Sequence, residues 1–316
     1  MIVVILFIAI LLLTYFNGAN DNFKGVATVW GSNTLNYKQA LMLATITTFA
    51  GSICSYFFAA ALVKNFSGKG LVPDKIVSSI NFVLSVALAA AFTVLLATKL
   101  GFPISTTHGL VGALVGAGLV ASGNSVNFEN LGKTFFLPLV LSPVIAVATS
   151  LLVYTFTKAI KTNNLSLVNA AHCISAGVVS FARGLNDTPK LVALLLICNF
   201  FSLPINFILL AVVMAVGGII NAKKVANTMS KKITTLNHTQ GFTANIVTGI
   251  LVIIASIFGL PVSTTHVSVG SIYGIGLISK TNNNNEVIKI LLSWILTLPI
   301  AGLLSATIYF IIQKLN

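Results

Sequence analysis

Long apolar stretches without charged residues run through most of the chain and predict membrane-spanning helices. About 20 consecutive apolar residues are enough to cross the hydrocarbon core of a bilayer as a helix. Four stretches fit one span each, namely residues 39–63, 76–98, 134–157 and 290–313. Residues 191–221 form a longer stretch with Pro204 near its middle, so this segment is expected to bend or divide.

Residues 2–16 are also apolar, but they differ from a cleaved secretory signal. No basic segment precedes them, and no small-residue cleavage pattern comes before the polar run that starts at Asn17. We therefore expect a retained helix. As a helix this stretch reaches only about 24 Å, whereas the hydrocarbon core is roughly 30 Å thick. The helix must then continue through the polar run or end inside the membrane.

The composition supports an all-α polytopic membrane protein. Hydrophobic residues make up 56% of the chain and charged residues only 7%, whereas a soluble domain carries roughly 25% charged residues. The net charge of +13 comes mainly from lysines in the short connections, a pattern typical of contact with anionic lipid rather than nucleic acid. The three cysteines lie singly in apolar segments, so neither a metal-thiolate site nor a redox pair is predicted, and no cofactor is expected.

Two pairs of motifs show that the chain is internally duplicated. Residues 101–119 and 259–277 are identical at 11 of 19 positions, and both contain the string P-x-S-T-T-H. Residues 18–24 and 184–190 share G-x-N-D-x-x-K. Chance similarity between apolar segments would match Leu, Ile and Val rather than these polar residues. We expect a first transmembrane repeat over 1–160 and a second over 161–316.

The duplication predicts where a site should lie. Many secondary transporters consist of repeats that meet at a binding site near the bilayer midplane. If the segments that follow Pro103 and Pro261 cross the membrane fully, each half has an odd number of spans and the repeats are inverted. We expect two homologous, inverted repeats with broken or re-entrant helices that meet at the midplane.

The two N-D motifs predict a cation site. Only five acids occur in the chain, and Asp21 and Asp187 are the two that fall in apolar segments. A charged side chain at mid-bilayer costs about 2.5–3.5 kcal/mol on insertion scales and is usually functional. Amide and carboxylate oxygens suit a hard cation such as sodium, and an aspartate can also carry a proton. The predicted site comprises Asn20, Asp21, Asn22, Asn186, Asp187 and Thr188, with Asp21 and Asp187 as the sodium ligands. Alternatively, Lys24 and Lys190 form plain i,i+3 salt bridges with the two aspartates.

The two P-x-S-T-T-H strings predict an anion site. Pro103 and Pro261 interrupt the preceding helices, and Ser and Thr favour the N-cap position of a new helix. From 239 to 279 no charged residue occurs over 41 positions; as one helix this run would be about 60 Å long, so Pro261 must divide it. A helix N-terminus binds phosphate-like anions. The predicted phosphate-binding residues are Ser105, Thr106, Thr107, Ser263, Thr264 and Thr265. The alternative is a packed helix pair whose hydroxyls bond to their own backbone.

Several charged or titratable residues adjoin these motifs. His108 and His266 end the S-T-T-H strings, and we expect neutral side chains that hydrogen-bond around the site, with proton coupling as the alternative. Arg183 is the only arginine in the chain; it suits a bidentate contact with phosphate, or it balances Asp187. Like these residues, Lys24 and Lys190 are expected to lie around the site and to support the residues that bind the ions.

The motifs G-A-N-D, G-L-N-D-T-P-K and the two P-x-S-T-T-H strings resemble the inorganic phosphate transporter (PiT) family, over about residues 17–278. This resemblance implies sodium- or proton-coupled phosphate symport, an inverted repeat and a homodimer. It places Asp21, Asn22 and Asp187 near cations and the six hydroxyls near phosphate. Two features depart from the family: residues 22–25 read N-F-K-G where many members have a small-residue string, and the chain is short.

We therefore expect a secondary active phosphate transporter of the cell (plasma) membrane that works by alternating access, with sodium favoured over protons as the coupling cation. The alternatives are a sulfate or related oxyanion permease of the same architecture and an anion channel. An intramembrane enzyme acting on a phosphorylated lipid is less well supported, because symmetry argues against an asymmetric reaction centre.

Phosphate with two aspartates brings about −3 to −4 charges; two lysines, one arginine and two helix ends offset up to about +4. The sequence therefore does not fix the coupling stoichiometry.

Overall fold

The computed structural model describes residues 1–159 and 164–315, and in this part of the chain it is helical throughout, with no β-sheet. Eight of the described helices are long and apolar enough to cross a membrane, four in each half. The predicted all-α polytopic fold is therefore confirmed. The predicted boundary between the repeats, 160/161, lies outside the described residues.

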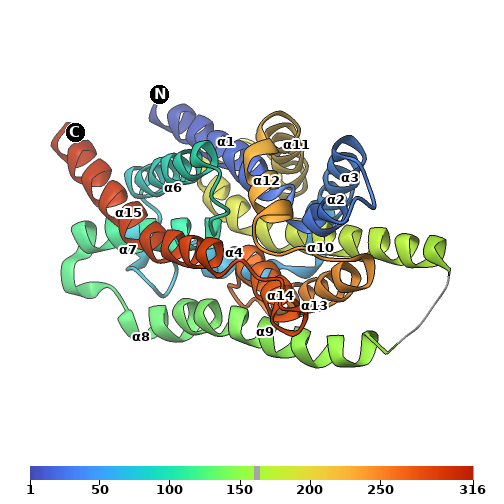
Figure 1. Ribbon diagram of the computed structural model, residues 1–316. Coiled ribbons are helices and arrows are strands. Elements are labelled where there is room, and N and C mark those ends of the chain that lie inside the picture. The colour runs from blue at the N-terminus through green and yellow to red at the C-terminus, as the bar shows by residue number, and fades with distance from the viewer. Residues whose placement is uncertain (160–163, 316) are drawn as a thin grey trace.

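The helices follow one another along the chain with short connections (Figure 1). The first half contains α1 Ile2–Asp21, α2 Ala27–Gly31, α3 Tyr37–Phe58, α4 Ala60–Phe66, α5 Asp74–Val77, α6 Ile80–Leu100, α7 Thr106–Ser122, α8 Phe128–Asn130 and α9 Leu137–Thr157. The second half contains α10 Leu165–Leu195, α11 Leu203–Asn221, α12 Lys223–Lys231, α13 His238–Ile257, α14 Thr264–Ser279 and α15 Asn284–Leu315.

The N-terminal helix continues through the polar run, which is one of the two outcomes expected from the sequence. Helix α1 ends at Asp21, and a 3₁₀ turn, Lys24–Val26, leads into α2. The second N-D motif lies within α10, which continues to Leu195. The stretch 191–221 divides: α10 ends, and α11 begins at Leu203 with Pro204 in its first turn, where proline has no helix hydrogen bond to lose.

Both predicted breaks before the S-T-T-H strings are confirmed. Helix α6 ends at Leu100 and α7 begins at Thr106, while α13 ends at Ile257 and α14 begins at Thr264. The connections contain Gly101 and Gly259 at φ values of 79° and 70°, a left-handed conformation that glycine adopts without steric cost. The two shorter helices therefore begin inside the protein rather than at its surface.

The packing of the helices repeats in the two halves. Helix α1 packs on α6 and α11, and α10 packs correspondingly on α13 and α3. Helix α7 packs on α15 of the other half, and α14 packs on α9. Figure 1 shows α9 along the lower edge of the view and α15 leading to the C-terminus at the upper left. Each half thus packs one long helix, α9 or α15, against the shorter broken helix of the other half.

The glycines of α7 explain how closely it approaches α15. A Cβ atom added at Gly112 or Gly116 would overlap the backbone carbonyl of Leu298 or Gly302 in α15. The small residues of α7 therefore let its backbone approach that of α15 closely.

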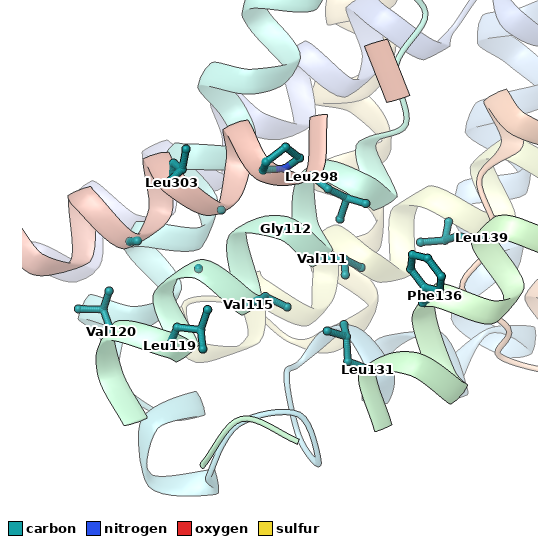
Figure 2. Close-up of a pocket in the computed structure, with 14 residues that line it drawn as sticks. Val111, Gly112, Val115, Leu119, Val120, Leu131, Phe136, Leu139, Leu298 and Leu303 are labelled. Carbon is teal, nitrogen blue, oxygen red and sulfur yellow. The ribbon is translucent and has the colours of Figure 1, made fainter. Parts of the chain in front are cut away.

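An apolar cavity of about 540 Å³ adjoins the same contact (Figure 2). It lies between α7, α15 and the segment that leads into α9, and it is lined by residues such as Val115, Leu131 and Leu303. All of its lining residues are apolar or glycine. It is therefore not a site for an inorganic anion, and the polar centre of the protein lies elsewhere.

Candidate functional site

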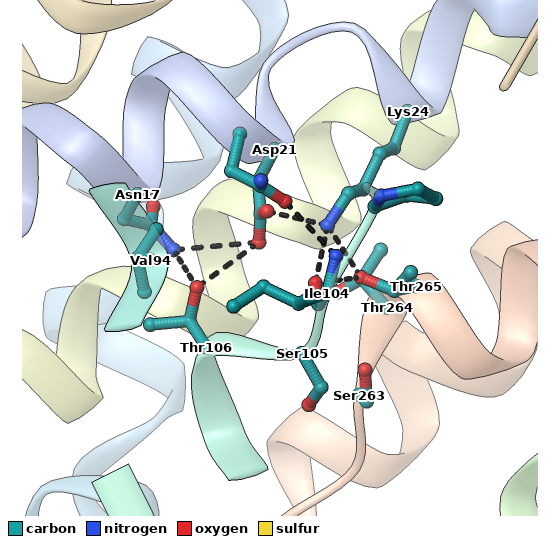
Figure 3. A network of polar contacts seen from close by, with 12 residues as sticks. Asn17, Asp21, Lys24, Val94, Ile104, Ser105, Thr106, Ser263, Thr264 and Thr265 are labelled. Carbon is teal, nitrogen blue, oxygen red and sulfur yellow. Dashed lines mark hydrogen bonds and ion pairs between the residues drawn. The ribbon is translucent and has the colours of Figure 1, made fainter. Parts of the chain in front are cut away.

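The two N-D motifs and the two S-T-T-H strings meet in the interior. Asp21 and Asp187 are 3% and 4% exposed, and all six serines and threonines of the strings are buried. Figure 3 shows Asp21 and Lys24 between Thr106 at the start of α7 and Thr265 at the start of α14. The structure thus brings the two aspartates and the six hydroxyl residues into one region, although some of them are more than 200 positions apart along the chain.

Ser105 and Ser263 are the N-caps of α7 and α14. The Oγ atom of Ser105 accepts from the backbone N–H of His108 at 3.1 Å, and that of Ser263 accepts from His266 at 3.3 Å. Each serine thus fixes the start of its helix, and the first turn presents further N–H groups that have no partner within the helix. Two partial positive charges meet near the aspartates.

Asp21 is held by groups from both motifs of its own half. The Nζ atom of Lys24 lies 2.5 Å from Oδ1. The other carboxylate oxygen, Oδ2, accepts from the Thr106 hydroxyl at 3.5 Å and from the Asn17 amide at 3.4 Å. The same Asn17 amide donates to Thr106 Oγ1 at 2.9 Å. Asn17 was not predicted to belong to the site, although it occupies the position equivalent to Arg183 in the first motif.

Asp187 is paired with two basic side chains. Arg183 Nε lies 3.6 Å from Oδ2, and Lys190 Nζ lies 3.2 Å from Oδ1. The guanidinium group also donates to the side-chain oxygens of Asn17 at 3.0 Å and Asn22 at 3.2 Å. Arg183 is fully buried. It therefore balances the charge of Asp187, which is one of the two roles predicted for it. It also connects the two N-D motifs.

The lysines lie inside the site rather than around it. Lys24 Nζ donates to the carbonyl oxygen of Ile104 and to the hydroxyl of Thr265, both at 2.6 Å. Lys190 Nζ donates to Thr107 Oγ1 at 2.8 Å and to the carbonyl oxygen of Val262 at 3.2 Å. The i,i+3 salt bridges with the aspartates are present, but they account for only one of the three contacts of each ammonium group.

Asn20 and Asn186 position the chain before α7 and α14. The Asn20 amide donates to Thr98 Oγ1 at 2.9 Å, and its oxygen accepts from the backbone N–H of Ile104 at 3.2 Å. The Asn186 amide donates to Thr264 Oγ1 and to the Val262 carbonyl, both at 3.2 Å. These two asparagines thus join each N-D motif to the S-T-T-H string of its own half.

The structure does not bring all six predicted cation ligands together. Asn22 donates to Thr45 at 3.0 Å, and Thr188 donates to Ser52 at 2.7 Å, both on α3. Both side chains contact α3 because they follow the aspartate by one position, which places them about 100° further around the helix. The oxygen of Asn22 also accepts from Arg183 at 3.2 Å, so this side chain still touches the centre. Only the aspartates direct charged oxygens into the centre.

The rings of His108 and His266 contact each other in the first turns of α7 and α14. Their ring centroids lie 4.5 Å apart, and Nδ1 of each faces a backbone carbonyl at 3.2 Å, that of Trp294 for His108 and that of Leu139 for His266. The Trp294 ring stacks on His266 at 3.8 Å, and its Nε1 donates to the Pro103 carbonyl at 3.0 Å. Trp294 carries no motif signal, so sequence reasoning missed it.

Five ionisable side chains therefore form one buried cluster. With all five ionised, Asp21 and Asp187 contribute −2 and Lys24, Arg183 and Lys190 contribute +3, which gives a formal charge of +1. Around this cluster lie two symmetry-related helix starts and their hydroxyl groups. Two related halves, broken helices and a charged site at their junction define the class of secondary membrane transporters.

Within that class, the chain belongs to the phosphate transporter family. The sequence model of that family matches residues 17–170 and again 161–305, one match for each half. The family and the relatives described next are transporters and not enzymes.

Curated relatives match nearly the whole chain. A probable low-affinity inorganic phosphate transporter of Bacillus subtilis is 28% identical over 99% of this chain and 97% of its own length. A protein of the same description from Rhizobium meliloti is 29% identical over 94% and 92%. Among solved structures, one described as the sodium-dependent phosphate transporter superposes with a TM-score of 0.89 at 25% identity and covers 100% of both chains.

Proposed function

We propose that this protein carries inorganic phosphate across the plasma membrane by cation-coupled symport, with alternating access to one central site. The observation that carries the proposal is the junction of two equivalent helix starts with a buried cluster of net charge +1. Such a site attracts an anion, and its hydroxyl and N–H groups replace the hydration shell that phosphate loses on entry.

The proposed phosphate site lies between the starts of α7 and α14. Ser105, Thr106 and Thr107 approach it from one half, and Ser263, Thr264 and Thr265 from the other. Because each half contributes equivalent groups, a rocking movement of one half against the other exposes the same site to either side of the membrane. In this scheme the interface between the halves forms the gate.

Sodium is the coupling cation that we favour. The Oδ1 atoms of Asp21 and Asp187 contact lysines, and the Oδ2 atoms are the oxygens that we assign to sodium, because hard oxygen ligands suit this ion. The solved structure with the same fold is described as a sodium-dependent phosphate transporter, which supports the same choice. We also propose that the protein works as a homodimer, which chemical cross-linking of the membrane-embedded protein tests.

Uptake of labelled phosphate into proteoliposomes tests this function. We expect accumulation driven by an inward sodium gradient and abolished when sodium is equal on both sides. Uptake that responds to neither a sodium gradient nor a pH gradient contradicts symport. Excess unlabelled sulfate should compete poorly, and trans-acceleration by internal phosphate should distinguish a carrier from a channel.

A further inference from the structure

Each of the two buried lysines ends in a cage of three oxygen atoms of different chemical kinds. The Lys24 ammonium contacts a carboxylate oxygen of Asp21, the carbonyl oxygen of Ile104 and the hydroxyl of Thr265 at 2.5–2.6 Å. The Lys190 ammonium contacts the corresponding oxygens of Asp187, Val262 and Thr107 at 2.8–3.2 Å. The side chains of both lysines are almost completely buried.

The two cages are equivalent under the internal duplication. Ile104 and Val262 occupy matching positions of the two P-x-S-T-T-H strings, as do Thr107 and Thr265. In each cage the carboxylate and the carbonyl come from the lysine's own half, and the hydroxyl comes from the other half. A plain helical salt bridge explains the carboxylate contact alone. The crossed hydroxyl contacts mean that each cage forms only where the two halves meet.

A carboxylate, a carbonyl and a hydroxyl oxygen are the ligands that a hard monovalent cation prefers. An ammonium group has the same charge as a sodium ion and is fixed to the backbone. We propose that Lys24 and Lys190 are tethered cations that take the places of two transported sodium ions. The number of sodium ions that accompany each phosphate is then lower by one for each lysine. This inference rests on the proposed function as a phosphate symporter.

The charge of the cluster supports this role. With both lysines the five charged groups sum to +1, so a phosphate of charge −1 or −2 leaves a total of 0 or −1. Without the lysines the cluster sums to −1, and the same phosphate leaves −2 or −3. Because uncompensated charge is costly inside a membrane, a transporter without these lysines needs about two more cations to load its substrate.

The test measures the ratio of sodium to phosphate flux in proteoliposomes with both ions labelled. The variants are Lys24→Ala, Lys190→Ala and the double variant. We expect the ratio to rise by about one in each single variant and by about two in the double variant. The matched control is Lys289→Ala, which removes the exposed lysine of an i,i+3 pair with Glu286 and should leave the ratio unchanged. An unchanged ratio in the lysine variants overturns the inference.

A second measurement covers variants that fold but do not transport. The melting temperature of the purified protein is followed as sodium replaces choline at constant ionic strength. A vacated cage should bind sodium, so each lysine variant should gain a saturable, sodium-specific increase that is larger than any increase in the wild type and the Lys289→Ala control. Variants that fold without transporting and gain no such sodium response likewise refute the role of the lysines as tethered cations.

Phosphate exchange separates the two proposals. Exchange of internal for external phosphate by the wild type, with sodium equal on both sides, tests phosphate transport alone. If exchange is absent, the proposed function fails. If exchange occurs and the lysine variants keep the wild-type sodium ratio and sodium response, only the tethered-cation inference fails.

Discussion

Replacing Thr106 or Thr264 with valine removes one hydroxyl from the proposed phosphate site at nearly constant volume. Thr106 Oγ1 accepts from the Asn17 amide at 2.9 Å, and Thr264 Oγ1 accepts from the Asn186 amide at 3.2 Å. Both asparagines keep other partners, among them Arg183 for Asn17 and the Val262 carbonyl for Asn186. We therefore expect the two variants to fold.

Both substitutions should weaken phosphate binding much more than they affect folding. A hydrogen bond to a charged group contributes about 1.5–3 kcal/mol, which corresponds to roughly 10- to 150-fold in affinity. The KM for labelled phosphate uptake in proteoliposomes should rise by a factor in this range if KM follows affinity, while circular dichroism and gel filtration should match the wild type.

The matched control for this experiment is Thr93→Val on α6. Thr93 is also buried, but its hydroxyl donates to the backbone carbonyl of Ala89 in its own helix at 2.8 Å. This variant should keep the wild-type KM. If Thr106→Val and Thr264→Val also keep the wild-type KM, or if the control shifts as much as they do, the assignment of the threonines to the anion site is wrong.

Four further substitutions test other parts of the account. Asp21→Asn and Asp187→Asn should each reduce sodium-driven uptake at least tenfold while most of the protein still folds, as judged by gel filtration; normal uptake in both speaks against their role. Gly116→Ala should lower the melting temperature by several degrees, because the added methyl group meets a backbone carbonyl of α15; an unchanged value contradicts the observed helix contact. Trp294→Phe removes the hydrogen bond to Pro103 and should destabilise the protein by about 1 kcal/mol in denaturant unfolding; equal stability would show that this bond contributes nothing.

The sequence singled out most residues of the candidate site because they are polar or charged exceptions within apolar segments. Asp21 and Asp187 stood out since charge is costly in a membrane, and the internal duplication showed that both copies belong to one arrangement. Proline marked the breaks before α7 and α14 because its backbone preference is a local property. Charge, periodicity and turn chemistry can all be evaluated without knowing which helices touch.

Contacts between the halves could not be predicted in the same way. The contact of Lys24 with Thr265 depends on how the halves are placed relative to each other, which no single segment encodes. Asn22 and Thr188 were predicted as cation ligands from their position next to an aspartate, but the sequence did not show that the direction of a side chain around a helix brings both into contact with α3. Trp294 approaches the histidines only through the packing of α15.

The most direct test of the shared site is a crystal structure of the protein bound to arsenate, a tetrahedral analogue of phosphate that is located by its anomalous scattering. The account predicts one arsenic peak between the starts of α7 and α14, with oxygens within hydrogen-bond distance of Thr106 and Thr264, which belong to different halves. A peak that contacts only one half, or that lies away from both helix starts, contradicts the central claim.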